Sequence, residues 1–341
     1  MRVSQRTCVA FLAFALLHGS ARAADEALIA AAKNEGAVVW YTTQIIDPLV
    51  LAMNKAFQSK YGIRIDYVRA NSGEIVLRLV NEARAGKVQA DVYDGTTTAE
   101  ALKKEGLALQ WLPDEAKSFP ADYRDQDGYW VATNFYVITA AYNTTLVPAG
   151  TEPRSWDDLL DPKWRGQIAW GGTPSISGAA GFIGIVLKEW GEEKGRAYLK
   201  KLSEQRIGAI AGSARTVIDQ AIAGEYAIAL QVFPEHAFGG AKKGAPIRWI
   251  PMRPGVSTVV STTGVTKAAP HPNAGKLLLD FLISEEGQNI YRDAFYIPAH
   301  PNVKPIEPEL APSNYHAIFL TPAEANEKMP KWLDVQKEMF R

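Results

Sequence analysis

The stretch that decides the fold is EGAVVWYTTQIIDPLVLAMNKAFQSKYGIRIDYVRANSGEIVLRLVNEARAG, residues 35–86. Its apolar run at 37–43 predicts a strand, and the apolar residues of 48–61 recur at helical spacing. A second strand is predicted at 63–70 and a second helix at 73–86. This alternation of strands and helices predicts an α/β protein whose sheet is mainly parallel, with helices on both faces.

The same alternation continues on both sides of that stretch and begins again after residue 166. Further helices are predicted at 25–36, 97–106, 179–191, 212–224 and 272–294, and further strands at 90–95, 167–170, 207–211 and 226–233. We interpret the two series as two α/β lobes. The chain is expected to cross between them near Trp130 to Ala141 and to return near Pro251 to Thr262, and paired crossings favour a hinge over a flexible tether.

The first 23 residues differ from the rest of the chain. A basic start, an apolar run and a small-residue end at Ala21-Arg22-Ala23 predict a signal peptide cleaved after Ala23, and therefore a periplasmic protein. Three of the 37 Lys and Arg residues would leave with it while all 37 Asp and Glu stay, so the mature charge would be −3. That charge argues against nucleic-acid binding. The only cysteine, Cys8, would also leave, so disulfides and thiolate metal sites are not expected.

Five segments together carry a resemblance to a known family. They are AAAKNEGAVVWYT (30–42), ADVYDGTTTAEALKKEGLA (90–108), LLDPKWRGQIAW (159–170), AIAGEYAIAL (221–230) and HPNAGKLLLDFLISEEGQNIY (271–291). In order and spacing the chain resembles the ferric-ion-binding branch of the solute-binding proteins of ABC importers. The resemblance implies a two-lobed Venus-flytrap fold, a ligand between the lobes, no catalysis, and delivery to a membrane permease with its ATPase. It suggests lobe 1 at 24–130 plus 252–300, lobe 2 at 131–251 plus 301–341, and a monomer.

The iron ligands of that branch are not matched. The tyrosine pair of its members would fall on Pro234-Glu235, their histidine on Ile45, and only Asp94 remains as a distant carboxylate candidate. Fe³⁺ prefers phenolate and carboxylate oxygens, so the usual iron site is not expected and no cofactor is predicted. Adjacent Glu235 and His236 could still ligate a metal, line the site, or be ordinary loop residues after the strand.

The predicted ligand-binding residues lie where strands end and helices begin, because binding sites of α/β sheets form at the carboxyl ends of strands. They are Thr42, Thr43, Ser72, Gly73, Tyr93, Thr96, Ser175, Ser177, Gly178, Ala179, Arg215, Phe233, Glu235 and His236. The resemblance places an anion at the turn 175–179, where free N–H groups at a helix start can hold an oxyanion. Other interpretations stay open: Ser177 as a simple helix cap, Arg215 as a surface residue, and the aromatic rings as core.

These features predict a periplasmic solute-binding protein that captures a small anionic, phosphorylated or carboxylated organic solute. Ferric iron held by an exogenous anion or chelator is the alternative within this class. An enzyme is disfavoured because the chain has no G-x-S-x-G, H-E-x-x-H, P-loop or G-x-G-x-x-G motif. Proteins of this fold can also present a ligand to a membrane sensor, so the fold alone does not distinguish that role from transport.

Overall fold

The computed structural model describes residues 19–340, so most of the predicted signal peptide lies outside the described residues. The helices are α1 (Gly19–Glu35), α2 (Leu51–Tyr61), α3 (Ser72–Arg84), α4 (Thr98–Lys104), α5 (Ala179–Ser203), α6 (Ala214–Ile222), α7 (Pro234–Lys242), α8 (Pro272–Ile283), α9 (Glu285–Asp293) and α10 (Pro322–Met339). The strands are β1 (Ala37–Thr42), β2 (Arg64–Arg69), β3 (Val92–Gly95), β4 (Val131–Asn143), β5 (Ile168–Gly171), β6 (Gly208–Ile210), β7 (Ile228–Val232), β8 (Ile247–Ile250), β9 (Val256–Val265), β10 (Ile297–Pro298) and β11 (Ala317–Phe319).

Shorter turns fill several connections. A π-helical turn precedes α2 at Ile46–Val50, and 3-10 turns occupy Asp114–Ser118, Ala121–Tyr123, Asp157–Leu160, Pro162–Trp164, Pro308–Leu310 and Pro312–Asn314. Within residues 19–340, the model contains no helix whose length and apolar character would let it cross a bilayer.

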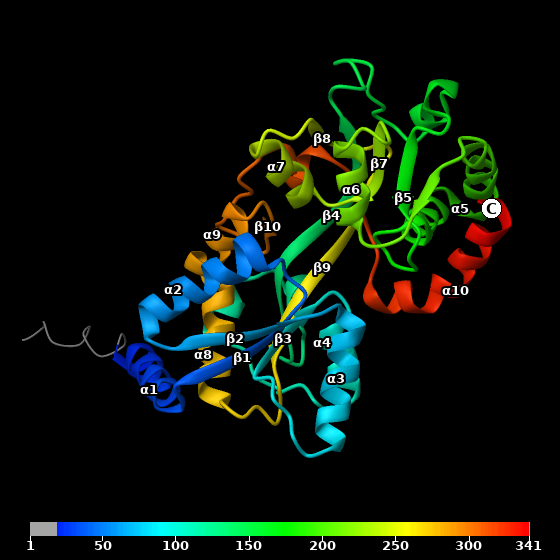
Figure 1. The fold of residues 1–341 in the computed structure, drawn as a ribbon. Helices are drawn as coiled ribbons and strands as arrows, with labels where there is room; N and C mark the ends of the chain where they lie inside the picture. Colours follow the sequence, from blue (N-terminus) through cyan, green and yellow to red (C-terminus); the bar gives the residue numbers. More distant parts are fainter. Residues whose placement is uncertain (1–18, 341) are drawn as a thin grey trace, which may run out of the picture.

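Lobe 1 is built on the parallel strands β2, β1 and β3, in that order across the sheet (Figure 1). Strand β1 pairs with β2 from Ala37↔Arg64 to Thr42↔Arg69, so both strands end at the same edge. On one face α2 and α8 meet through the rings of Phe57 and Phe281, whose centroids are 5.5 Å apart. The carboxyl ends of these strands therefore form one common edge, as the sequence predicted.

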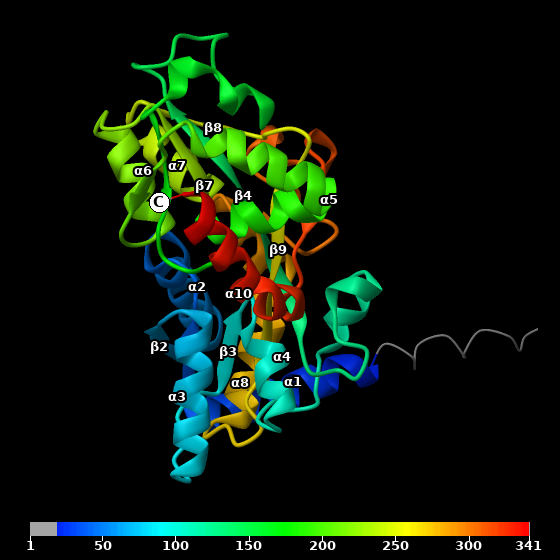
Figure 2. The same cartoon turned by 90° about the vertical axis from the view of Figure 1, so that its right-hand side faces the viewer.

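Lobe 2 repeats this arrangement with the parallel strands β7, β5 and β6. Its longest helix, α5, is kinked at Gly191, which has φ 76° and ψ 174°. The last helix, α10, packs on α5, and there Gly184 leaves room for an indole: a Cβ on Gly184 would lie 2.7 Å from Cε2 of Trp332. Figure 2 shows α10 beside the lower end of α5.

Two long strands, β4 and β9, join the lobes (Figures 1 and 2). They pair antiparallel from Val131↔Thr263 to Ile138↔Ser257, with a register shift between Ala132 and Asn134, at the two predicted crossings. Strand β9 also pairs antiparallel with β3 of lobe 1, and β4 pairs antiparallel with β7 of lobe 2. The expectation of a mainly parallel sheet is thus wrong for the centre of the molecule. The chain rises through β4 and returns through β9, which forces opposite directions on the hinge strands.

Candidate functional site

The ends of β1 and β3 in lobe 1 are locked together by one buried carboxylate. Asp94 accepts hydrogen bonds from the backbone N–H of Thr43 at 2.8 Å, from its hydroxyl at 2.7 Å, and from the hydroxyl of Thr42. Burial raises the pKa of Asp94, while these hydrogen bonds oppose the rise. Thr42 is fully buried and directed at Asp94, whereas Thr43 stays half-buried at the strand end.

The side chains of two threonines and one serine of lobe 1 converge on Gly95, two of them through their hydroxyl oxygens. A Cβ built on Gly95 would lie 2.6 Å from Oγ of Ser72, 3.1 Å from Cγ2 of Thr43, and in collision with Oγ1 of Thr98. Gly95 has φ 146°, a conformation that L side chains rarely adopt. Oγ1 of Thr98 is buried without a hydrogen-bond partner. The structure therefore gathers small hydroxyl groups where β1, β3 and α3 meet.

The other predicted residues of lobe 1 differ in position. Gly73 is exposed in the first turn of α3, and Thr96 is half-buried just before α4. Tyr93 is fully buried, in a core cluster with Tyr41 and Leu79, so its ring has no surface to offer a ligand. The core interpretation left open for aromatic rings fits Tyr93.

At the start of α5, Gly178 and Ala179 are both buried, and the N-cap is not Ser177. Gly178, with extended backbone, is the N-cap and makes no side-chain cap bond, while the hydroxyls of Ser175 and Ser177 lie 3.3 Å apart. A Cβ on Gly178 would lie 2.7 Å from the carbonyl oxygen of Thr173, so a larger residue would not fit at this position. The alternative in which Ser177 caps the helix is therefore wrong, because Gly178 holds that position and the Ser177 hydroxyl lies beside that of Ser175.

Arg215 lies at the start of another helix of lobe 2, α6. It is exposed in the first turn of α6, and its Nε donates to Oδ1 of Asp219 at 2.9 Å. The hydroxyl of Thr173 donates to the carbonyl oxygen of Gly212 at 3.0 Å, which ties the loop before α5 to the turn before α6. The starts of α5 and α6 therefore stand side by side.

Pro234, Glu235 and His236 are not in a loop after the strand, as one interpretation of the sequence held. They form the first turn of α7, where the fixed φ of a proline suits the first helical position. The end of β7 is irregular: Gln231 has φ 62° and lies opposite a break in register between Thr139 and Ala140. Such a bulge redirects the following residues.

The two titratable groups of this turn are shifted in opposite directions, and both are driven toward neutrality. Burial raises the pKa of Glu235 to about 8, since the side chain is only 7% exposed and its own backbone N–H is the one donor acting on it. Burial, helped by Arg215 and Arg69, lowers the pKa of His236 to about 4. The negative charge of Asp219 opposes that lowering. At neutral pH both side chains are therefore uncharged.

Arg69 is the residue that sequence reasoning missed. It ends β2 in lobe 1, is exposed, and acts on the pKa of His236 in lobe 2 together with Arg215. The charges of two guanidinium groups from opposite lobes thus act on one imidazole. The available signal was its position at a strand end directly before the start of α3, the criterion that selected Ser72.

A polar network on the hinge strands was also missed. The side-chain nitrogen of Gln44 donates to Oδ1 of Asn134 at 3.2 Å and to Oγ of Ser261 at 3.3 Å, and the hydroxyl of Tyr136 donates to Oε1 of Gln44 at 3.1 Å. All of these groups except Tyr136 are fully buried. The network joins the loop after β1 to both crossing strands.

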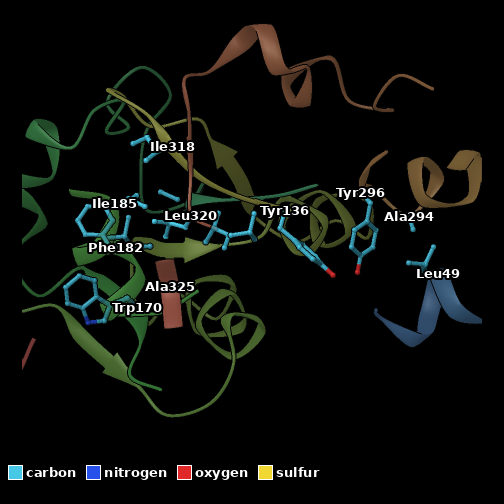
Figure 3. Close-up of a cluster of buried hydrophobic side chains, with 14 of the residues drawn as sticks. Leu49, Tyr136, Trp170, Phe182, Ile185, Ala294, Tyr296, Ile318, Leu320 and Ala325 are labelled. Atoms are coloured by element: carbon cyan, nitrogen blue, oxygen red, sulfur yellow. The ribbon is translucent and has the colours of Figure 1, made fainter. Parts of the chain in front are cut away.

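A row of aromatic rings continues from this network into lobe 2. The centroids of Phe233 and Tyr136 are 5.3 Å apart, and those of Tyr136 and Tyr296 are 5.7 Å apart. Figure 3 shows the hydroxyl oxygens of Tyr136 and Tyr296 at the lower ends of their rings, on the same side. Both hydroxyl groups interact electrostatically with Glu235. Glu235 therefore lies where the hinge meets α7.

The surface hollows of the described chain do not mark the candidate site. Three hollows of the described chain lie elsewhere: along α2 near Leu51, around the turns at 150–164, and beside β8 near Arg248, with a volume of about 610 Å³ for the last. None is lined by a predicted site residue. We base the candidate site on the convergence of polar groups. Within residues 19–340, no three His, Cys, Asp or Glu side chains gather closely enough to hold a metal ion.

Residues 90–316 match the model of a protein family described as bacterial extracellular solute-binding protein. The chain belongs to this family. It is 25% identical over 315 residues to a putative 2-aminoethylphosphonate-binding periplasmic protein of Salmonella typhimurium, covering 89% of this chain and 85% of that protein.

Solved structures of this kind share the fold. Iron-bound HitA from Pseudomonas aeruginosa aligns with a TM-score of 0.73 and 23% identity, over 89% of this chain and 99% of its own. AfuA from Actinobacillus pleuropneumoniae, with fructose-6-phosphate bound, aligns with a TM-score of 0.72 and 22% identity over the same shares. The two-lobed fold of periplasmic binding proteins, expected from the sequence, is confirmed.

Proposed function

We propose that this protein is the periplasmic solute-binding component of an ABC importer and that it captures a small organic anion between its lobes. The observation that carries the proposal is that two exposed arginines stand at site edges of opposite lobes, Arg69 at the end of β2 and Arg215 in the first turn of α6, and that the charges of both act on His236. A ligand held by both guanidinium groups favours approach of the lobes, because it gains contacts only when both are near.

The surrounding groups suit a phosphate, phosphonate or carboxylate. Helices α3, α5, α6 and α7 all begin at the carboxyl edges of the two parallel strand groups, and free N–H groups at a helix start attract anions. Hydroxyl groups of Thr43 and Ser72 stand at the edge of lobe 1, and those of Ser175 and Ser177 at the edge of lobe 2. An arginine fork pairs well with a phosphorus oxyanion.

The relatives support a phosphorus-containing solute. The names of the Salmonella relative and of the AfuA complex refer to a phosphonate and a sugar phosphate. The signal peptide at 1–23, the lobe boundaries given above, the monomeric state and delivery to a permease with its ATPase belong to the same proposal. The relatives named here are binding proteins, and a transport role asks for no catalytic group.

The test begins with a thermal-shift screen over sugar phosphates, phosphonates, carboxylates, polyamines and Fe³⁺, since a tight ligand raises the melting temperature by mass action. Calorimetry on the best phosphorus-containing ligand then compares wild type with Arg69→Ala and Arg215→Ala. Each should weaken binding at least about tenfold, the loss of a charge-assisted bond. Arg64→Ala is the matched control, because Arg64 is exposed at the opposite end of β2 and pairs with Asp66. Equal affinity in all variants would overturn the proposal.

Ferric iron held with an exogenous anion is a second candidate, favoured by one observation. The hydroxyl of Tyr136 lies within electrostatic range of Asp94 and Glu235, which together offer the oxygen ligands that Fe³⁺ prefers. Titration with ferric citrate distinguishes the two: a visible charge-transfer band that disappears in Tyr136→Phe would favour iron.

A further inference from the structure

Glu235 is a buried carboxyl group that lacks a side-chain partner among the described residues. Its side chain is only 7% exposed, and among the described residues no donor acts on it except its own backbone N–H. Buried polar groups normally have partners, and an unpaired buried carboxylate is costly. The binding of an anion by two arginines does not explain a carboxyl group here.

The walls around Glu235 are aromatic. Phe233 precedes it by two residues, and its ring packs edge-on against Tyr136, which packs in turn against Tyr296. The hydrogen of the Tyr136 hydroxyl is donated to Gln44, so it does not satisfy Glu235. A carboxyl group beside aromatic rings is an arrangement that favours a cation, since ring faces attract positive charge.

The cations of the candidate site do not neutralise Glu235. Among the described residues neither Arg69 nor Arg215 forms an ion pair with Glu235, and Nε of Arg215 donates to Asp219 at 2.9 Å instead. The candidate site therefore has two chemically different ends. One carries guanidinium groups and helix N–H groups, and the other carries an uncompensated carboxyl group with aromatic walls.

We propose that the solute is a zwitterion whose protonated amine binds at Glu235, against Phe233 and Tyr136, while its anionic group binds at Arg69 and Arg215. This inference rests on the proposed function and narrows its ligand class. Because the pKa of Glu235 is raised to about 8, the carboxyl group is protonated at pH 7 before binding. When the ammonium group arrives, Glu235 ionises, its proton passes to solvent, and an ion pair forms.

Three phosphonates of the same length test the inference: 2-aminoethylphosphonate, 2-hydroxyethylphosphonate and ethylphosphonate. Calorimetry at pH 7 in PIPES and in Tris gives the affinity and the number of protons exchanged. The amine is expected to bind about tenfold or more tightly than either analogue, and on binding it wild type should release about one proton more than Glu235→Gln does. The proton count is compared between the two proteins with the same ligand, because the ammonium group lowers the second pKa of its own phosphonate.

Glu235→Gln should remove both the preference and the extra proton while still binding ethylphosphonate. Glu225→Gln, a substitution of an exposed residue beyond α6, is the matched control and should behave as wild type. A hydroxyl analogue that binds as well as the amine, or a preference that survives in Glu235→Gln, would overturn the inference. If Glu235→Gln does not fold, the three wild-type affinities still decide. If none of the three phosphonates binds, the proposed function is contradicted as well. If all three bind equally, only the inference of an amine at Glu235 is contradicted.

Discussion

The hydroxyl of Tyr136 donates a hydrogen bond of 3.1 Å to Oε1 of Gln44, and this bond joins a hinge strand to the loop that follows β1. Gln44 is fully buried, and its side-chain nitrogen already donates to Asn134 and Ser261. The orientation of the Gln44 amide is thus fixed at both ends. A neighbouring tyrosine, Tyr296, makes a weaker hydrogen bond, because its hydroxyl accepts from the N–H of Ile45 at 3.4 Å.

Tyr136→Phe should lower the free energy of unfolding by about 1–2 kcal/mol, because it leaves a buried amide oxygen without a donor. Tyr296→Phe keeps the same ring volume and loses only the longer bond, so its cost should be smaller. Urea unfolding of both variants checks the order. A larger loss in Tyr296→Phe would show that the Gln44 bond does not hold the hinge.

Gly95→Ala should destabilise the protein by about 1–3 kcal/mol and weaken anion binding together. The φ of 146° is strained for alanine, and the new methyl group would push Ser72 and Thr98 apart. Gly73→Ala is the control, since nothing lies within 4 Å of its Cβ position and alanine favours a helix. Melting temperature and ligand affinity measure both effects. An unchanged affinity in Gly95→Ala would show that the hydroxyl groups around Gly95 do not contribute to ligand binding.

Glu235→Gln should make the ligand-free protein progressively more stable than wild type as pH rises. The pKa of Glu235 is about 8 in the folded chain and 4.5 ordinarily, so the unfolded chain binds fewer protons between these values and wild-type stability falls with pH. Between pH 6.5 and 8.5 this difference amounts to about 2 kcal/mol. Unfolding curves of wild type and variant at both pH values check it. Parallel pH profiles would contradict a buried, neutral carboxyl.

Local patterns predicted most elements but not the contacts between lobes. The starts of α3, α5 and α6 were predictable because strand ends and helix spacing are written in neighbouring residues. The importance of Arg69 was not, because it depends on how close one lobe comes to His236 of the other. The bulge at Gln231 was equally hidden, since a left-handed glutamine has no sequence signal and is set by the pairing of β7 with β4. That bulge accompanies the start of α7 at Pro234, where a loop was one expectation.

His236→Gln should raise the acid stability of the protein. The pKa of His236 is about 4 in the folded chain and 6.5 ordinarily, so between these values the unfolded chain binds the extra proton and wild-type stability falls as pH falls. Glutamine does not titrate, so at pH 5 the variant should be about 2 kcal/mol more stable relative to wild type than it is at pH 8. His271→Gln is the contrasting control, because Nδ1 of His271 lies 2.9 Å from Asp91 and its removal should cost stability. Nδ1 of His236 is buried without a partner, so no comparable bond is lost. Equal losses at pH 5 and pH 8 in His236→Gln would show that the imidazole takes up a proton as readily in the folded chain as in the unfolded one, which would contradict a buried, neutral His236.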